Sequence, residues 1–131
     1  MWLCTCSEDV HVFEAAIDAL SFATMLGMQG RDWRAASLLS LGGVPPATAR
    51  SGKGSVPAAL AQYLADNPGA RTLHLHLDND EAGLNAAARI SALLGDKYEV
   101  RIEPPEVGKD VNDHLRALAS RRRAGRADRE R

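Results

Sequence analysis

The strongest constraint on the fold is a regular alternation between short apolar runs and longer segments with helical periodicity. The runs that predict strands are residues 9–13, 35–41, 71–77 and 97–103. The segments that predict helices are residues 14–28, 56–65, 81–94 and 111–119. Strands that alternate with helices in this way imply right-handed crossovers and a mostly parallel sheet. We therefore expect an α/β fold: a compact, doubly wound, mostly parallel four-stranded sheet flanked by helices.

Apolar periodicity indicates the helices of these segments. In residues 14–28 the positions that recur at helical spacing are Ala16, Ile17, Leu20, Ala23, Thr24 and Met28. In residues 81–94 they are Leu84, Ala87, Ala88, Ser91 and Leu94, and Gly95 follows where a helix C-cap is expected. Each set recurs at helical spacing, and the second lies on one face of its helix.

The length of 131 residues and an apolar content of 45% suit a single domain with one ordinary core. We expect an extension over residues 1–8, the domain over residues 9–120, and an arginine-rich tail over residues 121–131 that is disordered or frayed. Because the formal net charge is -1, contact with nucleic acid must be local rather than through bulk positive charge. The tail is either a solvated end or a source of arginines for phosphates.

The only cysteines, Cys4 and Cys6, do not form a disulfide framework, and structural zinc needs more ligands than this pair supplies. Free thiols in a reducing compartment are the expectation. The first residues do not have the pattern of a signal peptide, and no run of about 18 apolar residues is present. These features predict a soluble, cytoplasmic protein without a membrane partner.

Acidic residues follow two of the predicted strands directly. Glu14 comes after the first strand, and Asp78 and Asp80 come after the third. In an open parallel sheet, ligands bind at the carboxyl ends of the strands where the winding reverses. If these two strands are neighbours, three carboxylates converge at one edge, where their mutual repulsion would favour a hard divalent cation such as Mg²⁺. The alternative is structural, with Asp80 as a helix N-cap and Glu14 at a helix start.

Two histidines, His74 and His76, alternate with leucines along the third strand and so share one face of it. A zinc site would need further ligands that the sequence does not place. The pattern favours packing or hydrogen bonding beneath a helix.

Four motifs in order carry a family resemblance: VFEAAIDALS, LSLGG, HLDNDEAG and GKDVND. Together they resemble the Toprim family, most closely the primase-like Toprim domains of plasmids, phages and other mobile elements. The resemblance spans about residues 10–118. It departs from many members at Ala15, where glycine is common, and the chain has no tyrosine in a recognisable strand-breaking module, which makes topoisomerase activity by this chain alone unexpected.

The resemblance implies a role for each matching residue. Glu14 corresponds to the glutamate that acts as general acid/base or assists metal binding, and Asp78 and Asp80 correspond to the pair that holds Mg²⁺ (or Mn²⁺). Asp18, one helical turn after Glu14, would support the site or bind the metal.

The remaining matches surround this core. Gly83 would let the backbone bend or the helix pack closely after the acidic pair. In the KDVND segment, Lys109 would contact a phosphate and Asp110 would complete the acidic cluster, with Asp113 beside them. The alternative for Lys109, Asp110 and Asp113 is a turn and cap that open the last helix. Outside the motifs, Arg50 and Lys53 in a basic loop could touch a nucleic-acid backbone.

The implied function is metal-dependent phosphodiester chemistry on nucleic acid, with DNA favoured over RNA: primase-like nucleotidyl transfer, or nicking by a nuclease. The chain would serve as a module of a larger replication or mobilisation protein, together with other domains or partners. A binding module that keeps the metal site but lacks chemistry is the main alternative. A phosphatase with a DxD nucleophile is less suitable, because that chemistry normally places the pair after the first strand.

Overall fold

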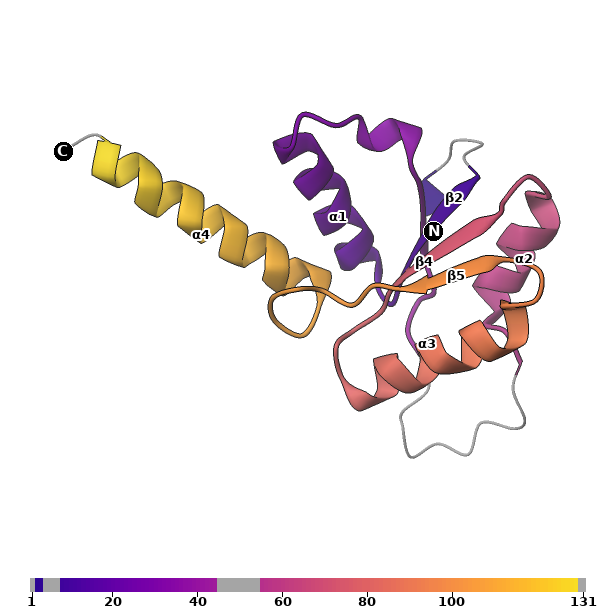
Figure 1. Ribbon diagram of the computed structural model, residues 1–131. Helices are drawn as coiled ribbons and strands as arrows, with labels where there is room; N and C mark the ends of the chain where they lie inside the picture. Colours follow the sequence, from indigo (N-terminus) through magenta and orange to yellow (C-terminus); the bar gives the residue numbers. More distant parts are fainter. Residues whose placement is uncertain (1, 4–7, 45–54, 130–131) are drawn as a thin grey trace.

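A computed structural model describes residues 2–3, 8–44 and 55–129, and its centre is a twisted sheet (Figure 1). The strands are β1 (Trp2–Leu3), β2 (Asp9–Phe13), β3 (Ser37–Ser40), β4 (Thr72–His76) and β5 (Glu99–Ile102). Their order in the sheet is β1-β3-β2-β4-β5. The four strands β2 to β5 are parallel, as predicted, and the short β1 adds an antiparallel edge beside β3 that the sequence did not predict.

The helices cover both faces of this sheet, which confirms the doubly wound α/β class (Figure 1). They are α1 (Ala16–Met28), α2 (Ala58–Asp66), α3 (Glu81–Leu94) and α4 (Val111–Arg129), with a 3-10 turn, η1 (Trp33–Ala35), before β3. Buried side chains of α2 and α3 form one core with Val10, Leu73 and their strand neighbours. Side chains of α1 and the start of α4 form the second core around Phe13.

The winding reverses between β2 and β4. The chain passes from β2 to β3 on one side and then returns across β2 to β4, so the connections leave β2 and β4 in opposite directions. Phe13, the last residue of β2, lies in register with His76, the last residue of β4. The crevice that such a reversal opens is the usual ligand position in open α/β sheets. The residues that follow Phe13 and His76 therefore share one edge of the sheet.

The residues that recur at helical spacing coincide only in part with the buried residues of α1 and α3. On α1 the buried residues include Asp18, Ala19 and Ser21, whereas Ile17 and Leu20 are about half exposed. On α3 the buried residues are Gly83, Ala86, Ala87 and Ile90, and Leu84 is exposed. Both helices place small residues against the sheet, which allows close approach, and periodicity cannot distinguish faces when most positions are apolar or small.

The last helix is longer than predicted. The prediction that it ends near residue 119 is wrong, because α4 continues without a break to Arg129. Arginine and alanine are good helix formers, which supports this extension. The outer part of α4 projects away from the sheet (Figure 1). Across the described residues, no helix combines the length and apolar character that a membrane span requires.

Candidate metal and phosphate site

Glu14 and Asp78 lie where the winding reverses. Glu14 is the first residue after β2, and Asp78 is the second residue after β4. Both carboxylates are partly buried, and each has one buried oxygen without a hydrogen-bond partner: Oε2 of Glu14 and Oδ1 of Asp78. Buried polar atoms in folded proteins are nearly always paired. Two unpaired oxygens on neighbouring strands thus mark a place where the fold leaves acceptors for something other than its own donors.

The electrostatics of this edge follow from several carboxylates close together. Burial is the main cause that raises the pKa of Asp78 to about 7, and Glu14, Asp18, Asp110 and Asp80 raise it further by repulsion. A carboxyl group with this pKa is half protonated near neutral pH when no cation is bound. Its position gains stability from any cation that screens the repulsion.

Asp18 lies on α1, one turn after the strand end, and is only 3% exposed. Burial raises the pKa of Asp18, and the backbone N–H of Asn112, which donates to its Oδ1 at 3.3 Å, acts in the opposite direction. The hydroxyl of Ser21 donates to Oδ1 of Asn112 at 3.1 Å. Neither Ser21 nor Asn112 was predicted as part of the site. Their only signals in the sequence are a place near Asp18 on the same helix and a place in the KDVND segment.

Asp80 begins α3 as its N-cap. Its Oδ1 accepts a hydrogen bond from the backbone N–H of Gly83 at 2.7 Å, and its Oδ2 lies 3.4 Å from Nζ of Lys109. Gly83 is needed here because a Cβ at this position would overlap the carbonyl oxygen of Asp78. The absence of a side chain lets the first turn of α3 press against the backbone that carries Asp78.

The segment of residues 108–113 closes the site from the side. Residues 78–80, between β4 and α3, form the acidic turn. The backbone N–H of Asn79 donates to the carbonyl oxygen of Lys109 at 2.6 Å, which connects the 108–113 segment to this turn. Inside the segment, Oδ1 of Asp110 accepts from the N–H of Asp113 at 2.8 Å, and Oδ2 of Asp113 accepts from the N–H of Lys109 at 3.1 Å. The turn-and-cap expectation for Asp110 and Asp113 is thus met, while Asp110 also adds charge near Asp78.

The structure therefore gathers most of the predicted residues in one place. Glu14, Asp18, Asp78, Asp80 and Asp110 interact electrostatically, with Lys109 at the rim. Asp113 is taken up by the turn that holds Lys109. Arg50 and Lys53 lie outside the described residues.

The donor set suits a hard divalent cation, which prefers carboxylate oxygens and commonly takes only one or two of them. The unpaired oxygens of Glu14 and Asp78 could each coordinate such an ion. Within residues 2–3, 8–44 and 55–129, no three potential ligand side chains already form a closed metal cluster. Both oxygens of Asp80 already have partners, the backbone N–H of Gly83 and the side chain of Lys109.

The histidines on the same two strands are arranged differently. Nδ1 of His11 and Nε2 of His76 are hydrogen-bonded at 2.8 Å, and His74 bonds to Oε1 of Glu103 at 2.8 Å and to Oδ1 of Asp9 at 3.0 Å. The ring of His11 stacks on that of His74 with centroids 4.5 Å apart. Phe22 of α1 covers them, with its ring centroid 4.7 Å from that of His76 and 4.9 Å from that of His11. Packing and hydrogen bonding of His74 and His76 beneath a helix are confirmed.

Comparison with known protein families identifies the family of this chain. A family model described as Toprim-like matches residues 11–115, which include the strand ends, the acidic turn and the 108–113 segment. No curated protein matches the chain in sequence. Since the matched region covers most of the chain and contains every described residue of the site, the chain belongs to the Toprim-like family.

Proposed function

We propose that this chain performs metal-dependent phosphodiester chemistry on nucleic acid, as primase-like nucleotidyl transfer or as nicking. The observation that carries the proposal is the pair of buried, unpaired oxygens on Glu14 and Asp78 at the reversal of the winding. Toprim domains generally bind a divalent metal and have functions related to nucleic acid. The choice of Mg²⁺ or Mn²⁺, the reaction and the preference for DNA belong to the proposal.

In this proposal Glu14 and Asp78 would hold the ion, because each has an unpaired carboxylate oxygen. Asp80 would be a further ligand, although its Oδ1 accepts from the N–H of Gly83 and its Oδ2 is paired with Lys109. A bound divalent ion polarises a phosphate and stabilises charge on the attacking or leaving oxygen. Glu14 is the candidate general acid/base, since it is the carboxylate that follows β2 and faces Asp78 across the crevice.

Lys109 and Asp80 form an ion pair at the rim of the acidic site. The lysine side chain is 60% exposed and that of Asp80 is 33% exposed. An exposed ion pair of this kind is worth little on its own, so a phosphate can compete for the ammonium group. In this proposal Lys109 would bind a phosphate of the substrate, and Asp80 would then lose its ion pair with the lysine.

Asp18 and Asn112 hold the site in place. Asp18 accepts from the backbone of Asn112, so the start of α4 is tied to α1 beside the acidic edge. We propose that Asp18 orients the cluster and adds negative charge. The same features suit a module of a larger DNA replication or mobilisation protein.

The test is to incubate the purified chain with Mg²⁺ or Mn²⁺ and DNA, with and without nucleoside triphosphates. We expect nicking or nucleotide incorporation that Asp78→Asn and Glu14→Gln each lower by about a hundredfold or more, since a metal supplies several kcal/mol of charge stabilisation. Asp96→Asn, which changes an exposed aspartate after α3, is the matched control and should retain activity. Equal activity in Asp78→Asn and in the wild type would refute the proposal.

A second candidate is a Toprim-like module that binds metal and nucleic acid without chemistry. The observation in its favour is the ion pair between Asp80 and Lys109, which leaves fewer carboxylate oxygens open. Calorimetric titration separates the two. Metal binding that depends on Asp78, without incorporation or nicking on any DNA or RNA, would support the binding module.

A further inference from the structure

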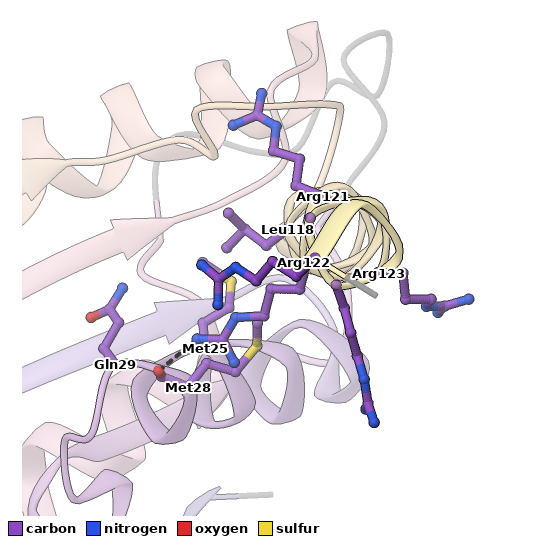
Figure 2. A pocket seen from close by; sticks show the side chains of 10 residues that line it. Met25, Met28, Gln29, Leu118, Arg121, Arg122 and Arg123 are labelled. Atoms are coloured by element: carbon purple, nitrogen blue, oxygen red, sulfur yellow. Dashed lines mark hydrogen bonds between the residues drawn. The ribbon is translucent and has the colours of Figure 1, made fainter. Parts of the chain in front are cut away.

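The second feature of the molecule that invites a ligand is a groove between the end of α1 and the outer part of α4 (Figure 2). Its volume is about 830 Å³. Met25, Met28 and Leu118 give it an apolar floor, and arginines of α4 surround that floor. The groove contains none of the carboxylates of the candidate metal site.

The groove arises because one stripe of α4 changes character along its length. Val111, Leu115 and Leu118 follow helical spacing and pack against α1 in the second core. The same spacing continues through Arg122, Gly125 and Arg129, all of which line the groove. A longer apolar stripe on α4 would let the two helices pack together along their whole length. Because Arg122 and Arg129 take these positions instead, the helices separate and leave the groove open.

The charge of the outer helix is strongly one-sided. Residues 119–129 contain five arginines and one aspartate, in a chain whose net charge is -1. Nη2 of Arg122 donates to the carbonyl oxygen of Met28 at 2.8 Å, which fixes this arginine at the C-terminal end of α1 (Figure 2). No carboxylate in the described ranges forms an ion pair with Arg121, Arg122 or Arg123. The rim is built to receive negative charge from outside the domain.

We propose that this groove binds a segment of single-stranded nucleic acid, with phosphates on the arginines and an unstacked base on the methionine floor. Duplex DNA offers phosphates but keeps its base faces stacked inside, so it would leave the apolar floor unused. A single strand offers both, and thioethers and guanidinium planes each make favourable contacts with aromatic rings. The inference rests on the proposed function, because it names the strand that the metal site would act on.

The path from groove to site is short. Helix α4 begins at the 108–113 segment that borders the acidic edge. At a rise of about 1.5 Å per residue, Arg121 lies about 15 Å and Arg129 about 27 Å along the helix from Val111. A strand held by these arginines therefore has its next nucleotides within reach of Asp78 and Lys109.

The test is binding of three fluorescent DNA probes in EDTA: a 20-nucleotide thymidine strand, an abasic strand of equal length, and a duplex. We expect the thymidine strand to bind about two- to twelvefold more tightly than the abasic strand, the range expected for sulfur–aromatic contact. It should also bind more tightly than the duplex. Equal binding of all three probes would overturn the single-strand inference and leave only attraction of charge.

Two kinds of variant locate the binding. The triple change Arg121→Gln, Arg122→Gln and Arg129→Gln should reduce the slope of log affinity against log salt by about 2, as expected for three lost phosphate contacts on a single strand. The matched control, Arg71→Gln with Arg89→Gln and Arg101→Gln, removes the same charge from other surfaces. An equal loss in the control would overturn the inference.

Gly125→Leu tests the floor without a change of charge. A Cβ at Gly125 would meet nothing within 4 Å, and leucine favours helix, so folding should be retained while the groove fills. We expect the preference for thymidine over abasic strand to vanish in this variant. A preference that persists would overturn the placement of the base, and self-association through the arginines in sedimentation, without DNA binding, would assign the groove to a second copy.

These outcomes are separable from failure of the proposed chemistry. Because EDTA removes divalent ions, the binding assay does not require an occupied metal site. Binding without any metal-dependent activity would refute the proposed reaction and retain the groove. Activity that is unchanged in the arginine triple variant, together with unchanged binding, would refute the groove and retain the reaction.

Discussion

Two polar clusters lie on the same pair of strands, β2 and β4, and they differ in how their polar atoms are paired. The histidine cluster of His11, His74 and His76 lies within the strands, and each ring has a hydrogen-bond partner. The carboxylate cluster around Glu14 and Asp78 sits at the strand ends and keeps unpaired oxygens. Both clusters are largely covered by the fold. Pairing, rather than burial, distinguishes a structural cluster from one that waits for a ligand.

The pKa values of the two clusters move in opposite directions for the same main reason. Burial disfavours charge, so it lowers the pKa of His11 to about 4, helped by His74, and raises that of Asp78 to about 7. His11 and His76 become neutral and hydrogen-bond to each other. Asp78 titrates close to neutral pH and is repelled by the neighbouring carboxylates, which is a cost that a bound cation would remove.

The largest effect is expected where the acidic turn meets α3. Gly83→Ala should lower the free energy of unfolding by about 1–3 kcal/mol and weaken metal binding, because its Cβ would overlap the backbone of Asp78. Gly125→Ala, whose Cβ meets nothing within 4 Å, should instead raise it by about 0.5–1 kcal/mol. Urea denaturation measures both. An unchanged free energy of unfolding in Gly83→Ala would contradict the close packing of Gly83 against the backbone of Asp78.

A double-mutant cycle probes the paired cluster. His11→Ala and His76→Ala should each lower the free energy of unfolding by about 1–3 kcal/mol, since each leaves the other ring without its partner. The double variant should cost about 1 kcal/mol less than the sum. His114→Ala, on α4, serves as the control and should change stability by less than about 0.5 kcal/mol. Strict additivity would show that the two rings are not coupled.

The carboxylate cluster should respond with the opposite sign. In metal-free buffer at pH 8, Asp78→Asn should raise the free energy of unfolding by up to about 1 kcal/mol, because it removes repulsion at a functional site. Added Mg²⁺ should then stabilise the wild type and leave the variant unchanged. Asp96→Asn should have neither effect. Destabilisation by Asp78→Asn would indicate that this carboxylate is structural.

The final prediction concerns how the free energy of unfolding depends on pH. Asp78 has a pKa of about 7 in the folded protein and a usual value of 3.8, so the folded state binds more protons between these values and loses stability as pH rises through 7. His11, with a pKa lowered from 6.5 to about 4, makes the folded protein lose stability as pH falls through that window. Subtracting the stability of Asp78→Asn or His11→Ala from that of the wild type at each pH isolates each contribution. If the two difference curves changed in the same direction with pH, the opposite pKa shifts of Asp78 and His11 would be contradicted.

Much of the architecture could be predicted from local pattern. The parallel strands, the helices between them and the position of Glu14 and Asp78 after strands all follow from apolar runs and the acidic residues that end them. The buried faces of α1 and α3 could not, because alanine and leucine share several faces of each helix and only contact with the sheet selects one. The length of α4 was missed because its support comes from Arg122 on Met28, residues far apart in the sequence.

The sequence by itself determined the α/β class and the acidic residues at the strand ends, since both depend on short-range order along the chain. The tertiary structure decided what each polar group does. It paired His11 with His76 across two strands, tied Asp18 to Asn112 and Asp80 to Lys109, and left Glu14 and Asp78 with open oxygens. Hydrogen bonds between distant residues depend on register and helix placement, and these are set only when the whole chain has packed.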